Sequence, residues 1–283
     1  MNQSLENTLV LCDLDTLLLG ADGNLTQVVR DVLQLYSGRG GRFTVFSQRS
    51  PRAVRTILGS VRLGAPALLC GGTLAYSFAE GSGRPLCGFE ALSDEFLSSL
   101  PAAAGVGIAL QMKDGTTRVL RMSQSLEQHL RQEWTPFLLS HAADVRSADV
   151  LRVLLYQDQK RSPVLQLFEK ALEESAAPLR AERVAPDVLV LTPRGVTGKE
   201  MLDAVCGGAG LEPDSLLVAA GSLPMLELVR AAGRSAAGAD APAELRLAAR
   251  RITLTDCAGG AAAEILYGLV RNAEKNAAPA KNR

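Results

Sequence analysis

Short apolar runs alternate with amphipathic stretches at both ends of this 283-residue chain. The run from Thr8 to Cys12 is apolar or β-branched at every position, as expected for a strand that helices cover on both faces. A helical pattern over 26–38 follows, then the strand-like "RFTVFS", a helix opened by Ser50 and Pro51, and the apolar run "APALLCGG". Strands and helices that alternate with short connections predict a doubly wound, mostly parallel sheet, which binds ligands outside the carboxyl ends of its strands.

The middle of the chain has a different pattern. It begins with the glycine-rich joint "AEGSGRP", and "VGIALQM" and "TTRVLRM" then flank "KDG" as a hairpin would. Helical patterns over 126–139 and 163–174 each lead to an apolar strand. We therefore predict an α/β core from residues 1–79 and 190–272, an inserted α+β domain over 80–189, and a disordered tail over 273–283.

Composition and charge narrow the class of protein. The 30 basic and 30 acidic residues give a net charge of zero, which favours neither nucleic acid nor an anionic membrane as a partner. The five cysteines form no C-x-x-C pair and leave an odd one over, so they indicate neither a zinc cluster nor a disulfide framework. Because the sequence also lacks a signal peptide and a long apolar segment, we expect a cytoplasmic protein, either a monomer or a homodimer.

Two aspartates follow the first predicted strand in "LVLCDLDTLLLGADG". Side chains two residues apart on a strand point to the same face, so Asp13 and Asp15 could reach one ligand; the alternative is a strand end capped by aspartates. In "FSQRS", Ser47 and Arg49 end the second strand beside the first, where a hydroxyl could bind an anion. The alternative is that Ser47 is the cap of the next helix.

Other polar residues add less. Lys199 lies at the start of a helix, where backbone N–H groups favour a phosphate, although "GKE" is not a P-loop. The alternative is a solvent-exposed lysine. His129 and His141 are twelve residues apart and have no ligand-like neighbours, so they do not indicate a metal site.

Taken in order, these segments resemble the haloacid dehalogenase superfamily, and within it the Cof-type sugar-phosphate phosphatases, over nearly the whole chain. The family opens with D-x-D-G-T-L-L and a D-G a few residues on, where this chain has "DLDTLLLGADG". "FSQR" corresponds to a strand ending T-G-R, and "PRGVTGKEML" to P-x-G-V-x-K-G with Gly198 and Lys199 exchanged. "DAPAELRLAARRITLT" is similar to the closing pattern of the family.

The resemblance implies a Rossmannoid core, a cap domain that chooses the substrate, and a small phosphorylated metabolite as that substrate. Asp13 would attack phosphorus to form an aspartyl-phosphate, and Asp15 would act as general acid and base. Ser47 and Lys199 would stabilise the transferred phosphoryl group. The cofactor would be Mg²⁺, held by Asp13, the backbone carbonyl of Asp15 and a carboxylate of the fourth motif.

The loop positions of the family carry unusual residues here. Arg49, Gly71 and Gly72 stand at substrate and loop positions, and Gly71 replaces the asparagine of the family's Asn-Gly. Thr16 and Leu17 replace the Gly-Thr pair after the second aspartate.

The fourth motif departs most. The family has G-D-S-x-N-D before Met-Leu, whereas this chain reads "AAGSLPMLEL". Gly221 therefore stands at the position of the metal-binding aspartate, and no acidic residue lies between Asp214 and Glu227. Two hypotheses follow: a hydrolase weakened by the missing metal ligand, or a catalytically silent relative that binds a ligand or a protein.

Overall fold

The computed structural model describes residues 5–89, 92, 95–100, 105–133, 135–158, 163–175 and 177–277. The chain forms two compact units. The first contains residues 1–48, 54–82 and 197–283, and the second contains residues 49–53 and 83–196. The predicted α/β fold with a mostly parallel core sheet and a second α+β unit is confirmed.

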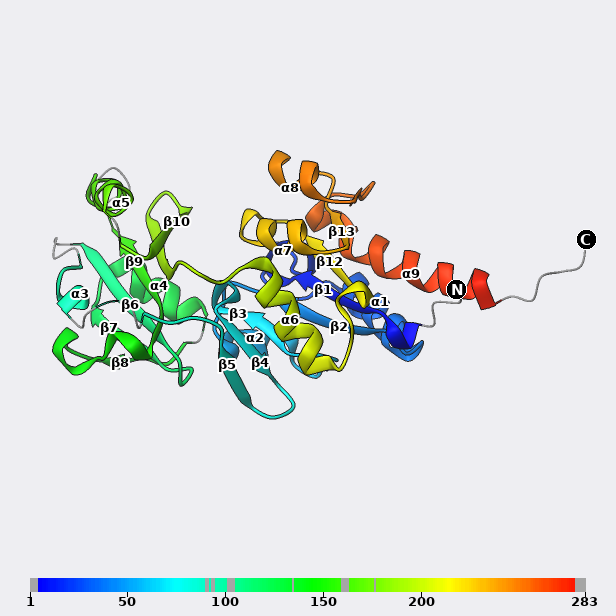
Figure 1. Cartoon of the computed structure of the whole chain (residues 1–283), viewed down its shortest axis with the longest axis horizontal. Helices are drawn as coiled ribbons and strands as arrows, with labels where there is room; N and C mark the ends of the chain where they lie inside the picture. The colour runs from blue at the N-terminus through cyan, green and yellow to red at the C-terminus, as the bar shows by residue number, and fades with distance from the viewer. Residues whose placement is uncertain are drawn as a thin grey trace, which may run out of the picture. The chain divides into compact units, whose positions relative to one another are not determined.

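An eight-stranded sheet lies mainly in the first unit (Figure 1). Neighbouring strands from β14 to β3 are parallel, and β4 is antiparallel to β3. In spatial order the strands are β14 (Arg251–Ile252), β13 (Arg234–Ala237), β12 (Leu216–Ala220), β1 (Leu9–Asp13), β2 (Arg42–Phe46), β3 (Ala67–Leu69), β4 (Leu74–Ser77) and β5 (Ser82–Pro85).

The strand order reverses beside β1. The chain moves outward from β1 to β2 and β3, and it later returns to the other side of β1 and moves outward from β12 to β13 and β14. Such a switch point leaves a crevice at the carboxyl ends of the two central strands, which is where doubly wound sheets bind ligands. All five residues of β1 are buried, which explains its continuous apolar run.

Helices cover the sheet in two groups. In the first, α1 packs against α9, as Figure 1 shows; in the second, α6 contacts α7, and α7 contacts α8. Thr26 caps α1 by accepting a hydrogen bond from the backbone N–H of Val29. The helices of the two groups, together with α2 after β2, are α1 (Gln27–Gly38), α2 (Pro51–Leu58), α6 (Gly198–Ala209), α7 (Leu226–Ala231), α8 (Ala243–Ala248) and α9 (Ala262–Ala277).

The last helix extends beyond the predicted boundary. We predicted a disordered tail from residue 273, but α9 continues to Ala277; the rest of that tail, residues 278–283, lies outside the described residues. An ion pair between Arg39 and Glu274 ties this end of α9 to the end of α1. This contact was not predictable from the sequence, because the polar residues of the segment do not indicate a partner 235 residues away.

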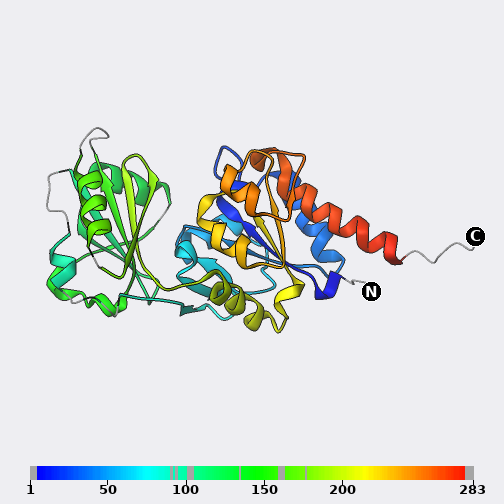
Figure 2. The same cartoon turned by 45° about the horizontal axis from the view of Figure 1, so that its top comes forward.

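The second unit is a six-stranded sheet with helices beside it (Figure 2). Along β9, Val153 and Leu155 pack into one apolar cluster, whereas Leu154 and Tyr156 pack into another, so both faces are covered. The strands in order are β10 (Leu179–Ala185), β11 (Val188–Pro193), β9 (Val150–Gln157), β6 (Val106–Met112), β7 (Thr117–Arg121) and β8 (Leu138–Leu139), and the helices are α3 (Glu95–Ser98), α4 (Gln124–Gln132) and α5 (Val164–Glu174).

One helix of this unit is shorter than predicted. The pattern over 126–139 predicted a single helix, but α4 ends at Gln132, and Leu138 and Leu139 form β8 beside β7. Pro136 explains the break, since the residue before a proline is disfavoured in helical conformation.

Candidate active site

The candidate site lies at the end of β1. Asp13 is the last residue of the strand and is 1% exposed, and residues Leu14–Leu18 then form a single π-helical turn. The carboxylate of Asp13 caps this turn by accepting a hydrogen bond from the backbone N–H of Thr16 (3.3 Å). The argument that Asp13 and Asp15 share one face of a strand is therefore wrong, because the strand ends before Asp15.

Asp13 is joined to the loop after β12. Its Oδ2 accepts hydrogen bonds from the hydroxyl of Ser222 (2.5 Å) and the backbone N–H of Gly221 (3.4 Å). Burial raises the pKa of Asp13, and the nearby Asp15 raises it further, while the hydrogen bonds from Ser222 and Gly221 lower it. The net pKa is above the ordinary value because the desolvation of this fully buried carboxylate outweighs its hydrogen bonds.

Asp15 turns toward the other neighbour of β1. Its Oδ2 accepts hydrogen bonds from the hydroxyl of Ser47 (2.8 Å) and from the backbone N–H of Gln48 (3.0 Å), both at the end of β2. Ser47 is fully buried, and it does not cap α2, since Ser50 accepts the hydrogen bond from the N–H of Ala53 (3.4 Å). The structure thus brings Asp13, Asp15 and Ser47 together, with each carboxylate bound to a different strand end.

The glycines after β3 have clear backbone roles. Gly71 and Gly72 have φ angles of +68° and +88°, in the left-handed region that favours glycine. The N–H of Gly71 donates to the carbonyl of Ser47 (3.0 Å). A Cβ on Gly72 would lie 2.5 Å from the sulfur of Met201, so α6 packs directly on this loop.

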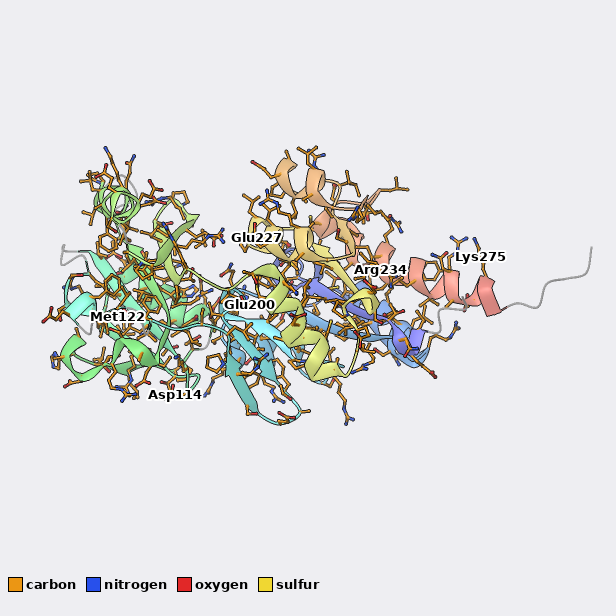
Figure 3. The ribbon with its side chains drawn as sticks, in the orientation of Figure 1. Asp114, Met122, Glu200, Glu227, Arg234 and Lys275 are labelled. Carbon is orange, nitrogen blue, oxygen red and sulfur yellow. The ribbon has the colours of Figure 1, made fainter. Side chains whose placement is uncertain are left out.

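Lys199 is not joined to the two aspartates. A Cβ added at Gly198 would lie 2.1 Å from the carbonyl oxygen of Glu227, so the first turn of α6 packs against the backbone of α7 and leaves no room for a side chain there. Lys199 is the next residue; its side chain is exposed and forms neither a hydrogen bond nor an ion pair within the described residues. Figure 3 labels Glu200 and Glu227, which mark these two helices.

Arg49 has a partner elsewhere. It groups with the second unit, where its Nη1 donates to Oε1 of Glu133 at 2.7 Å. The predicted role of Arg49 toward a substrate stays a prediction.

The metal ligand that the family would have is replaced by a packing contact. A Cβ on Gly221 would lie 2.3 Å from Oγ1 of Thr16, 3.0 Å from its Cβ and 3.1 Å from the sulfur of Cys257. Thr16 stands where the family has glycine, and Gly221 stands where it has aspartate. The side chain of Thr16 therefore fills the space that an aspartate side chain at position 221 would need. The sequence analysis treated the threonine and the glycine as two separate departures from the family. It did not predict that the two residues lie against each other.

These residues do not fit a Mg²⁺ ion. A hard divalent cation needs several oxygen ligands in near-octahedral geometry. Here one carboxylate oxygen of Asp13 already accepts from Ser222 and Gly221, and Thr16 occupies the position of the missing ligand. Within the described ranges, no group of three or more His, Cys, Asp or Glu residues is arranged to hold a metal.

The buried cysteines near the site are not nucleophiles. Burial, and then the nearby carboxylate of Asp13, raises the pKa of Cys12 to about 12. Burial and the contact with Asp240 likewise raise the pKa of Cys257 to about 12. Both thiols are therefore protonated at neutral pH, and only the thiolate attacks an electrophile.

The comparisons agree on the fold. Solved structures similar to this chain include TM0651 from Thermotoga maritima (15% identity, 92% of this chain and 97% of that one, TM-score 0.76) and a haloacid dehalogenase-like hydrolase from Bacteroides thetaiotaomicron (16%, 93% and 99%, 0.77). The HAD subclass IIB sugar phosphatase BT4131 is similar as well (13%, 93% and 99%, 0.75). At these identities the likeness shows the fold alone. No curated protein is significantly similar in sequence.

The family assignment comes from the sequence itself. Residues 10–265 match the family model of the haloacid dehalogenase-like hydrolases, which confirms the predicted resemblance. The match begins at Val10 in β1 and ends at Ile265 in α9, so it includes both aspartates and the altered fourth motif. The chain belongs to the haloacid dehalogenase-like hydrolase family.

Proposed function

We propose that this chain is a phosphomonoesterase of small phosphorylated metabolites, with slow turnover that Mg²⁺ does not increase. The fold is shared with a sugar phosphatase, and the two aspartates and the serine of the family pattern lie at the switch point of the sheet. The contact between Thr16 and Gly221 is the observation that carries the second half of the proposal.

In the proposed reaction, a carboxylate oxygen of Asp13 attacks phosphorus and the bond from phosphorus to the ester oxygen breaks. Asp15 gives its proton to the departing alkoxide and later takes one from the water that hydrolyses the aspartyl-phosphate. The hydroxyl of Ser47 and the N–H of Gln48 hold the Asp15 carboxylate in place. The side chains of this chain alone supply these steps.

Charge explains why the turnover is slow. At about 4 Å and an effective dielectric constant of about 20, each pair of like unit charges costs about 4 kcal/mol. Both aspartate carboxylates repel a phosphate dianion in this way. A lysine at position 198 would offset the repulsion, but this chain has Gly198 there, packed against α7. A protonated Asp13 lowers the repulsion, but it is then not a nucleophile.

A second function has support from one observation. Asp13 is 1% exposed, and both carboxylates accept hydrogen bonds from neighbouring strand ends, as structural groups do. This favours a catalytically silent relative in which the aspartates hold β1, β2 and β12 together.

One assay separates the two functions. Purified protein is incubated with a panel of sugar phosphates and nucleotides, with EDTA or Mg²⁺, beside Asp13→Asn and the control Lys275→Ala, which changes an exposed lysine of α9. The proposal predicts slow phosphate release in EDTA that Asp13→Asn abolishes and that Lys275→Ala preserves. Release that equals the buffer rate for every substrate would exclude the hydrolase and leave the silent relative.

A further inference from the structure

A pocket lined by three arginines lies in the first unit, away from the two aspartates. It has a volume of about 340 Å³ and is formed by β12, β13, β14 and one side of α9. Arg234 is the first residue of β13, and its partner Leu217 lies near the start of β12. The pocket is therefore at the amino ends of the parallel strands, whereas Asp13 lies at the carboxyl end of β1.

The charges in the pocket are not balanced. Arg251 forms an ion pair with Glu264 (2.9 Å). Arg234 and Arg250 form no ion pair with a carboxylate within the described residues; for Arg250 the backbone N–H alone is engaged, donating to the hydroxyl of Ser235 (3.1 Å). Two guanidinium groups are thus left without a counter-charge at one small cavity.

Arg234 supplies an independent reason to expect a ligand. Its Nη1 is buried and has no hydrogen-bond acceptor in the part of the chain that the structure describes. A buried donor without an acceptor is unfavourable, and it is rare in folded proteins unless a ligand or an ion satisfies it. Figure 3 shows Arg234 beside α9, which forms one wall of the pocket.

The walls define the kind of ligand. Leucine, isoleucine and alanine side chains line the interior, and Gly233 and Gly268 add no side chain to it. A volume of this size lies at the lower end of the range for small-molecule pockets. The planar guanidinium group matches the two oxygens of a carboxylate or a phosphate.

We propose that this pocket binds a small molecule with an oxyanion head and an apolar body, in which Arg234 and Arg250 hold the head and the apolar walls hold the body. The binding site is separate from the phosphomonoesterase site and does not depend on it.

Isothermal titration of the full chain with phenyl phosphate, benzoate and inorganic phosphate tests this proposal. Binding of phenyl phosphate or benzoate should weaken about tenfold or more in Arg250→Gln, because the variant loses a hydrogen bond between two charged groups. Arg62→Gln is the matched control: Arg62 is also exposed, and it lies outside the pocket. Asp13→Asn should leave the affinity unchanged, which separates this site from the aspartates.

The three ligands also separate the contributions. Phenyl phosphate that binds more tightly than benzoate indicates a phosphate head, the reverse indicates a carboxylate, and weaker binding of inorganic phosphate than of either confirms the apolar body. Arg234→Gln provides a second loss of affinity where that variant folds. Saturation by none of the three ligands, or equal affinities for the unmodified protein, Arg250→Gln and Arg62→Gln, would overturn the proposal.

Discussion

The contact between Thr16 and Gly221 can be tested by restoring the family's residues. In Gly221→Asp the new Cβ would lie 2.3 Å from Oγ1 of Thr16 and 3.0 Å from its Cβ, and neither atom belongs to a long flexible side chain. The φ angle of Gly221 is not in the left-handed region, so the cost comes from packing and charge rather than from backbone strain. Overpacking a buried position costs about 1–3 kcal/mol. For a chain of this size that lowers the Tm by about 2–12 °C.

The double variant Thr16→Gly, Gly221→Asp removes the clash and should recover most of the loss. The double-mutant cycle should therefore give a favourable interaction energy of about 1 kcal/mol or more. Gly221→Ala is the matched control, because it adds the same Cβ without a carboxylate. Thermal unfolding followed by circular dichroism, with and without about 10 mM Mg²⁺, measures the unmodified protein, the two single variants of the cycle, the double variant and Gly221→Ala.

Metal binding gives the double variant a second signature. With a Kd of about 1 mM, about 10 mM Mg²⁺ would stabilise the folded state by about 1.4 kcal/mol. We expect such an increase in Tm in the double variant and not in the unmodified protein. If Gly221→Asp is as stable as the unmodified protein, or if Thr16→Gly rescues nothing, the space between these loops is not filled as we argue.

Three further predictions concern the same site. Burial raises the pKa of folded Asp13 above 3.8, so its protonation stabilises the fold fully below that pH, and this stabilisation is lost as pH rises through the raised pKa. Urea unfolding from pH 4 to 8 should therefore show a free energy of unfolding that falls with pH in the unmodified protein and not in Asp13→Asn. Hydrolysis through ionised Asp13 should follow the opposite course and rise over the same pH interval, so a pH-independent rate would contradict its role as nucleophile. Ser222→Ala should lower the free energy of unfolding by about 1.5–3 kcal/mol at pH 8 in the same urea experiment, because the buried carboxylate loses its shortest hydrogen bond; a change within error would mean that Ser222 does not stabilise the charge.

Much of the core was predictable because its strands are strongly apolar. The continuous apolar run of β1 and the cap of α1 at Thr26 are local signals, and the structure has both. Strand β13 (Arg234–Ala237) was missed, since "RSAA" has neither β-branched nor aromatic residues and is a strand only because it pairs with β12. The sequence analysis also missed β10, because its charged residues interrupt the alternation of apolar and polar residues expected of a strand.

The site was predictable in its residues and not in its geometry. Order along the chain was sufficient to associate Asp13, Asp15 and Ser47, because the carboxyl ends of neighbouring parallel strands meet. The π-helical turn after Asp13 was not predictable, and it directs Asp15 toward β2 instead of β12. The packing of Gly198 against α7 depends on a contact between distant segments, which no local pattern contains.

Within the described ranges, no helix combines the length and the apolarity needed to cross a membrane. Location in the cytoplasm and the oligomeric state stay predictions.

The most direct test of the central claim is a titration of Mg²⁺ into the unmodified protein, followed by isothermal calorimetry. Because Thr16 fills the place of the missing ligand and Ser222 occupies an oxygen of Asp13, we predict no saturable binding up to about 10 mM, a concentration well above the sensor-site affinities known for divalent cations. Asp13→Asn should give the same flat trace. Saturable submillimolar binding by the unmodified protein that Asp13→Asn abolishes would contradict the account and show that the metal site survives.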